Sequence, residues 1–101
     1  MYVVLWEFHV RAGAEAAFER LYGPDGAWVA LFLTAGDYLG TELLRAADGA
    51  ARYVTVDRWR SADAYDAFRS AAADRYAEID AVGDGLTDAE RFVGAYVVVD
   101  D

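Results

Sequence analysis

The segment Arg52–Trp59, RYVTVDRW, constrains the fold most, because it predicts a β-strand with two useful sides. Successive side chains of a strand point to opposite faces of the sheet. One face of this strand carries Tyr53, Thr55, Asp57 and Trp59, and the other carries Arg52, Val54, Val56 and Arg58. If the valines pack on the core, the first set lies on the open face of a sheet.

Residues 2–10, YVVLWEFHV, predict a second strand with a clearer division of side chains. One side is purely apolar and carries Val4, Trp6, Phe8 and Val10. The other side becomes polar toward its end and carries Val3, Leu5, Glu7 and His9. The apolar side is expected to pack against helices. Residues 37–59 predict a hairpin with its turn at Asp48 and Gly49, and residues 95–99, AYVVV, predict the closing strand.

Apolar residues recur at helical spacing between these strands. Residues 14–22 predict a first helix, residues 24–36 an extra short helix and residues 61–83 a long helix, each ended by glycine. Ser61 is expected to cap the long helix at its start. The segment Thr87–Glu90, TDAE, fits a capping box and predicts a further short helix.

This order of elements matches the split βαβ, or ferredoxin-like, arrangement. It predicts an α+β fold in which a four-stranded antiparallel sheet carries helices on one face, within a single domain of residues 1–101. The other face is then bare. Burying its large side chains would contribute roughly 1.5 to 3 kcal/mol each, so a second copy of the chain is expected to cover it in a homodimer.

The composition excludes several functions. Eighteen acidic residues against nine arginines give a formal net charge of -9, which argues against nucleic acid or a membrane as partner. The chain has no cysteine, lysine, asparagine or glutamine, and its only histidine is His9. One histidine with dispersed acidic residues predicts no metal site. No apolar run approaches the roughly 18 residues that span a membrane, so a cytoplasmic protein is expected.

Four segments carry a family resemblance: GAWVALF, GDYLGTELLR, RYVTVDRWRSADAYDAF and LTDAE. They resemble the antibiotic biosynthesis monooxygenase family of the dimeric α/β-barrel superfamily over nearly the whole chain. The resemblance implies a homodimeric α/β barrel and a cofactor-independent monooxygenase that oxidises a small aromatic or polyketide-type phenol with O2. The alternative is a non-catalytic small-molecule-binding or stress-related dimer of the same fold.

The resemblance also indicates where a substrate would bind. Trp59 matches a tryptophan that lines the pocket of catalytic relatives, although its position also suits core or dimer packing. Those relatives use an asparagine on this surface, and the chain offers Thr55 in its place as a hydrogen-bonding group. Relatives that degrade haem bind it with a histidine on the helix after that tryptophan. Residues 61–79 contain no histidine, so neither haem nor another cofactor is expected.

The residues themselves nominate a base. His9 has a reference pKa of about 6.5 and can accept a proton near neutral pH, and Glu7 on the same face could raise that pKa. A solvated or structural role for His9 is the alternative. Asp57 is either a pocket carboxylate with a raised pKa or the ion-pair partner of an arginine at position 52, 58 or 60.

The predicted site combines these residues with nearby aromatic side chains. Trp28 either roofs the pocket or packs in the core. The predicted catalytic residues are His9, Trp59 and Thr55, and the predicted substrate-binding residues are Glu7, Trp28, Tyr53, Asp57 and Phe68.

Overall fold

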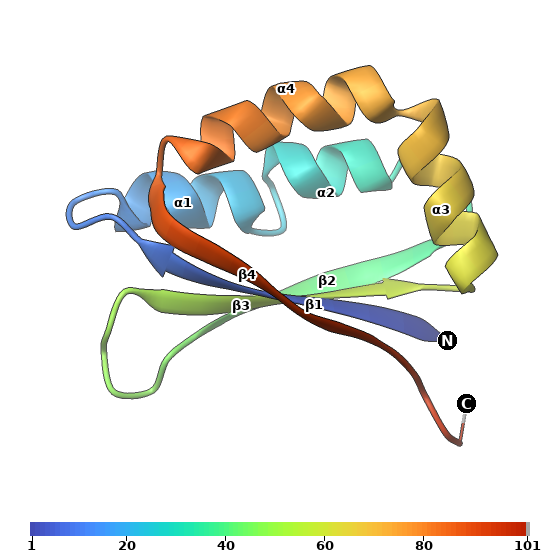
Figure 1. Ribbon diagram of the computed structural model, residues 1–101, viewed down its shortest axis with the longest axis horizontal. Helices are drawn as coiled ribbons and strands as arrows, with labels where there is room; N and C mark the ends of the chain where they lie inside the picture. The colour runs from blue at the N-terminus through green and yellow to red at the C-terminus, as the bar shows by residue number, and fades with distance from the viewer. Residues whose placement is uncertain (101) are drawn as a thin grey trace.

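The computed structural model describes residues 1–100, and within them it contains four strands and four helices (Figure 1). In chain order these are β1 (Tyr2–Val10), α1 (Glu15–Tyr22), α2 (Ala27–Phe32), β2 (Tyr38–Arg45), β3 (Arg52–Trp59), α3 (Ala62–Ala71), α4 (Ala73–Asp84) and β4 (Thr87–Val97). The strands form one antiparallel sheet in the order β2-β3-β1-β4. All the helices lie on one side of it (Figure 1). The predicted α+β, ferredoxin-like fold is therefore confirmed.

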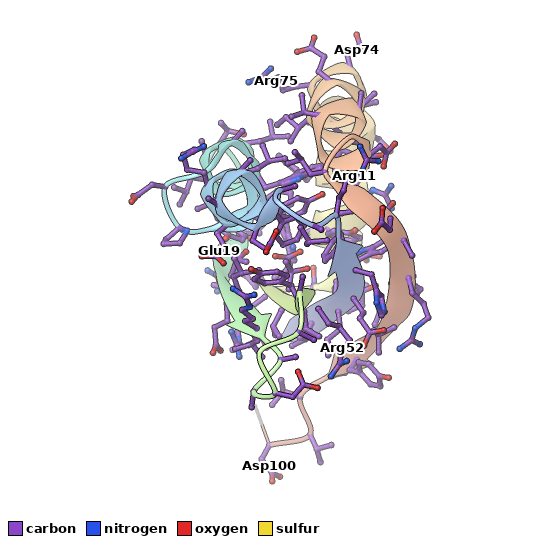
Figure 2. All side chains as sticks on the ribbon, turned by 90° about the vertical axis from the view of Figure 1, so that its left-hand side faces the viewer. Arg11, Glu19, Arg52, Asp74, Arg75 and Asp100 are labelled. Carbon is purple, nitrogen blue, oxygen red and sulfur yellow. The ribbon has the colours of Figure 1, made fainter. Side chains whose placement is uncertain are left out.

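The side chains of the helices and of one sheet face meet in a layer between them (Figure 2). Asp74 and Arg75, at the start of α4, point away from this layer (Figure 2). The core is largely aromatic. Its fully buried members include Phe18 and Trp59, which are both 0% exposed. The rings pack in tilted and edge-on pairs, such as Phe18 with Tyr53 at 4.8 Å between centroids. No helix of the described residues is both long enough and apolar enough to cross a membrane.

The strand β1 divides as predicted, but β3 is turned the other way. Val4 and Phe8 of β1 are buried under the helices, and Asp57 and Tyr53 pair with them across the ladder, so they share that face. The prediction that Tyr53, Thr55, Asp57 and Trp59 lie on the open face is therefore wrong. Large rings fill the thick layer beneath the helices better than valines do, and the valines of β3 lie half-buried on the open face.

The predicted long helix is divided in two. Residue Ala72 leaves the helical conformation at φ -104° and ψ 19°, ending α3 and starting α4. Figure 1 shows α3 rising from the sheet and α4 crossing above it. The bend lies in an alanine-rich stretch without glycine or proline, so no local residue type announces it.

The predicted short helix at Thr87–Glu90 is wrong, because these residues begin β4. Thr87 pairs with Val10, and the pairing with β1 continues to Val97, with register shifts between Leu5 and Trp6 and between His9 and Val10. A capping box is a local preference worth about 1 kcal/mol, whereas strand pairing along a whole edge of the sheet satisfies many backbone groups. The hairpin of β2 and β3 around residues 48–49 is present as predicted.

The second helix begins later than predicted. α2 starts at Ala27, after a tight turn in which the Gly26 N–H donates to the Gly23 carbonyl at 3.0 Å. A Cβ at Gly26 would collide with the carbonyl oxygen of Leu21, so this turn requires glycine. After the turn, α2 packs against the start of β2 and the end of β3, where the ring centroid of Phe32 lies 5.4 Å from those of Tyr38 and Trp59. The helix also contributes to the lining of the site described next.

Candidate functional site

A cleft lies between the helix-covered face of the sheet and the helices. It contains about 600 Å³ of space free of protein atoms, part of it open to solvent. Small-molecule sites are usually concave, with mainly apolar walls and a few polar groups. All four strands and all four helices contribute to its lining. The lining residues are Trp6, Phe8, Tyr22, Trp28, Phe32, Thr41, Thr55, Asp57, Arg69, Tyr76, Asp80 and Glu90.

Asp57 is the buried carboxylate of this cleft. It is 9% exposed, and its Oδ1 accepts a hydrogen bond of 2.6 Å from the Thr41 hydroxyl. Burial raises its pKa to about 6, because the charged form loses solvation, and the bond from Thr41 opposes that rise. A carboxylate with a pKa near 6 is ionised at neutral pH and still basic enough to accept a proton.

The alternative that Asp57 pairs with a nearby arginine is wrong. The three candidate arginines pair with other carboxylates: Arg52 with Asp48 at 3.7 Å, Arg58 with Glu42 at 2.6 Å and Arg60 with Asp37 at 3.0 Å. Within residues 1–100, Asp57 forms no ion pair. Its charge at neutral pH is therefore uncompensated by a contacting cation.

This arrangement predicts an unusual effect of pH on stability. Asp57 binds a proton more tightly in the folded state, at a pKa of about 6, than at the unfolded value of 3.8, so its protonation stabilises the fold. The gain is complete below the unfolded value and is lost as pH rises through 6. Two units correspond to about 3 kcal/mol. Wild type should therefore lose stability as pH rises from 4 to 7.5, whereas Asp57→Asn should not. The difference between the free energies of unfolding of Asp57→Asn and wild type, measured with urea, should shift by about that amount in favour of Asp57→Asn over this range.

The matched control is Asp37→Asn, which makes the same change at an exposed carboxylate that pairs with Arg60 at 3.0 Å. Its stability relative to wild type should change by less than about 1 kcal/mol over the same pH range, as for other surface ion pairs. A difference between Asp57→Asn and wild type that is the same at both pH values would contradict the raised pKa of Asp57.

Three of the predicted site residues line the cleft together. They are Trp28 on α2, Thr55 on β3 and Asp57 on β3. Thr55 is 4% exposed and lies opposite Trp6 in the ladder between β1 and β3. Trp28 is 7% exposed, and it packs edge-on against Tyr76 with ring centroids 4.7 Å apart. Trp28 thus belongs both to the roof of the cleft and to the core.

His9 and Glu7 lie on the opposite face of the sheet from the cleft. His9 is exposed, and its Nε2 is 3.7 Å from Oε1 of Glu7, which also accepts from Arg91 at 3.4 Å. The expectation that His9, Thr55 and Trp59 share one site within the chain is therefore wrong, because the sheet separates His9 from the other two. A proton-accepting role for His9 stays a prediction confined to the open face.

The other predicted site residues lie in the core beside the cleft rather than in its lining. Trp59 packs between α2 and α3, with ring centroids 5.4 Å from Phe32 and 5.1 Å from Phe68. Tyr53 is 1% exposed, and its hydroxyl donates to Glu19 of α1. Burial raises the pKa of Tyr53 to about 12. Tyr53, Trp59 and Phe68 therefore support the walls of the cleft from behind.

Sequence reasoning missed a polar group of lining residues from the second half of the chain. The guanidinium of Arg69 on α3 lies 4.8 Å from the ring centroid of Tyr76 on α4, a cation–π contact at the cleft. Asp80 follows Tyr76 by four residues, so both point to the same side of α4. The spacing of Tyr76 and Asp80 can be seen in the sequence. Glu90 could not be assigned to the cleft, because the predicted helix at Thr87–Glu90 does not place it on a strand of the sheet.

Acidic residues also gather where dispersed charges were expected. One carboxylate oxygen each from Asp80, Asp84 and Glu90 lie within 4.8 Å of one another. Burial raises the pKa of Asp80 and of Glu90, and repulsion from the neighbouring carboxylates adds to both shifts. The expectation that the acidic residues do not cluster is thus wrong at this end of the cleft.

The residues of the cleft do not fit a haem. Within the described chain its lining contains no histidine, and the tyrosines Tyr22 and Tyr76 are poor axial ligands, because burial raises the pKa of each phenol well above its usual range. An axial tyrosine must be ionised to bind iron, and a raised pKa opposes that ionisation. Aromatic walls and a buried carboxylate suit a flat organic molecule with an acidic proton instead.

Comparison with known proteins places the chain in a family. Residues 1–77 match the sequence model of antibiotic biosynthesis monooxygenases, so the chain belongs to the antibiotic biosynthesis monooxygenase family. The comparison with curated proteins returned no match. The resemblance noted in the sequence is therefore confirmed at the level of the family.

Solved structures of similar fold include three that cover almost the whole chain. SnoaB, a cofactor-independent oxygenase from Streptomyces nogalater, has a TM-score of 0.78 at 23% identity, over 96% of this chain and 91% of SnoaB. Rv0793 from Mycobacterium tuberculosis has a TM-score of 0.70 at 22% identity, over 99% of this chain and 96% of Rv0793. A mutant of MhuD with two manganese protoporphyrin IX molecules bound per active site has a TM-score of 0.70 at 23% identity, over 98% of this chain and 95% of MhuD. At these identities the likeness establishes the fold alone.

Proposed function

We propose that the protein is a cofactor-independent monooxygenase that oxidises a small aromatic, polyketide-type phenol with O2. The single observation that carries this proposal is Asp57, a buried carboxylate with a pKa of about 6 in an aromatic-walled cleft. Family membership and the likeness to SnoaB, itself a cofactor-independent oxygenase, support the same reaction class. The proposal moves the base from His9 to Asp57.

The proposed chemistry begins with a proton transfer. Asp57 accepts the phenolic proton of an anthrone-type substrate in its enol form, breaking the O–H bond and leaving a phenolate. The phenolate passes one electron to O2, and the resulting radical and superoxide join through a new C–O bond. Protonated Asp57 returns the proton to the terminal oxygen. Loss of the carbon-bound proton then breaks the O–O bond and expels hydroxide, so that CH2 and O2 become C=O and water.

Lining residues would orient the substrate for these steps. The rings of Trp6, Trp28 and Tyr76 offer flat surfaces for a fused aromatic system. The Thr55 hydroxyl lies on the same strand face as Asp57, two residues away, where it can hydrogen bond a substrate oxygen. Oδ2 of Asp57, the oxygen that does not accept from Thr41, can then accept the proton of the neighbouring phenol.

Oxygen uptake with a panel of hydroquinones and anthrones tests the proposal directly. At least one anthrone should consume one O2 per quinone formed, in protein treated with a chelator and shown to be free of flavin. If all members of the panel bind, as followed by quenching of tryptophan fluorescence, and none is oxidised, the protein is a non-catalytic small-molecule-binding protein of this fold. That outcome would replace the oxygenase proposal.

We also propose that two copies pair through the open face of the sheet. In the isolated chain this face presents half-buried Val3, Leu5, Val54 and Val56 together with exposed Leu44 and Tyr96. A second copy would remove this apolar surface from water, a gain proportional to the area buried. The helix-covered face is already occupied by the chain's own core and offers no comparable surface.

The dimer is tested by one substitution in the centre of that face. Leu5 lies between Val56 and Gly94 in the sheet, and Leu5→Arg would place a charge in the interface. Sedimentation should give wild type about twice the chain mass of 11.1 kDa and should show dimerisation weakened about 30-fold or more by Leu5→Arg. Leu33→Arg, at a leucine that is 67% exposed after α2, is the matched control and should remain dimeric.

A further inference from the structure

A chain of hydrogen bonds leads from Asp57 to the edge of the sheet. The Thr41 hydroxyl donates to Oδ1 of Asp57 at 2.6 Å, and the Tyr38 hydroxyl lies 2.5 Å from the same Thr41 oxygen. Thr41 and Tyr38 both belong to β2, which is an edge strand. Thr41 lines the cleft with Asp57, whereas Tyr38 lies behind it against Phe32 and Trp59.

The direction of this chain follows from the number of hydrogens. A threonine hydroxyl carries one hydrogen, and an ionised carboxylate only accepts. Because the Thr41 hydrogen is given to Asp57, the hydrogen between Thr41 and Tyr38 must come from the tyrosine. Donors arranged in series polarise one another and strengthen each bond. Within residues 1–100 this is the one hydrogen bond to the Asp57 side chain, so Oδ2 has no protein partner.

We propose that Thr41 and Tyr38 are positioning residues that hold Oδ1 of Asp57 in place and leave Oδ2 as the atom that meets the substrate. This inference rests on the proposed role of Asp57 as the base. It assigns to the edge strand β2 a function in the reaction, because the orientation of the carboxylate and its affinity for a proton both depend on two hydroxyls outside β3. The substrate then receives one defined basic atom rather than a rotating carboxylate.

Other titratable groups line the same cleft or interact electrostatically with Asp57, and their titration must be distinguished from that of Asp57 in any measurement. They are Tyr22 on α1, Tyr38 on β2, Tyr65 and Arg69 on α3, Tyr76 and Asp80 on α4, and Glu90 on β4. Burial raises the pKa of each of these tyrosines, so they stay neutral where Asp57 titrates. Burial also raises the pKa of Asp80 and Glu90, so a bulk titration would mix the three carboxyls.

A residue-specific titration by NMR of 13C-labelled aspartate side chains tests the inference without substrate or O2. The Asp57 signal is assigned by its loss in Asp57→Asn. Thr41→Val removes the donor at nearly constant volume and should raise the pKa of Asp57 by about one unit, whereas Thr41→Ser should keep it within about 0.3 units of wild type. Tyr38→Phe should raise it by a few tenths, because it weakens the Thr41 donor without removing it.

Tyr38→Phe keeps the ring that contacts Phe32 and Trp59, so it gives an answer even if Thr41→Val does not fold. An unchanged Asp57 titration in either variant, or equal shifts in Thr41→Ser and Thr41→Val, would overturn the inference. In an active protein the acidic limb of kcat/KM should move with the titration. Absence of oxygenase activity together with the expected shifts would remove the proposed reaction and leave the positioning of Asp57 established.

Discussion

Asp57→Asn is expected to lower kcat for the oxidation of an anthrone by about 10²–10⁴-fold, the usual contribution of a positioned general base. The amide has nearly the same shape as the carboxylate, and its oxygen can still accept the hydrogen bond of the Thr41 hydroxyl. It cannot accept the substrate proton at neutral pH. Substrate binding should therefore change little, and the loss should appear in the chemical step.

The pH profile gives the same variant a second, independent readout. In wild type, kcat/KM should fall as pH drops through about 6, because Asp57 becomes protonated and can no longer act as a base. Asp57→Asn should lack this acidic limb. Stopped-flow absorbance under air measures both variants, and Asp37→Asn, which changes an exposed carboxylate paired with Arg60, should keep the wild-type profile.

His9→Ala separates the two candidate bases. With Asp57 as base, His9→Ala should keep kcat within about twofold of wild type, since His9 is exposed on the face opposite the cleft. A large loss in His9→Ala with little change in Asp57→Asn would contradict the assignment of Asp57. It would instead place the reaction on the open face, where His9 and Glu7 lie 3.7 Å apart.

The sequence pattern was sufficient for the topology of the fold because most elements carry strong periodic signals. β1 has one purely apolar side, and that side packs under the helices as predicted. β3 has no such asymmetry, since Val54 and Val56 alternate with Tyr53 and Thr55, and both sides are partly apolar. Its orientation is decided by the pairing register with β1 and by the volume that the helices leave to be filled, which are properties of the whole fold.

The site was only partly predictable for the same reason. Asp57, Thr55 and Trp28 were recognised as candidates, and all three line the cleft. The sequence predicts His9 as the base because histidine is the usual proton acceptor near neutral pH, but a residue type carries no information about which face of a sheet the residue occupies. The pKa of Asp57 comes from burial, and burial becomes known only when β3 is placed under the helices.

Trp59→Ala is expected to lower the free energy of unfolding by about 3–5 kcal/mol, the range for large aromatic residues removed from a core. Trp59 is 0% exposed and packs against Phe32, Tyr38, Tyr65 and Phe68 from three elements. The cavity left by the indole could not close without moving α2 or α3, which are fixed by the same rings. Such a loss is a large fraction of the stability of a domain of this size.

Trp59→Phe separates this core role from the predicted catalytic one. The smaller ring keeps part of the packing and should cost less than half as much as alanine by chemical denaturation. The indole Nε1 of Trp59 is buried without a hydrogen bond within the described chain, so its replacement leaves no partner unsatisfied. If Trp59 acts only through packing, Trp59→Phe should keep kcat within about threefold of wild type below its unfolding temperature. A loss of kcat as large as that of Asp57→Asn, in a folded Trp59→Phe protein, would instead show that Trp59 contacts the substrate and that the cleft extends to it during the reaction.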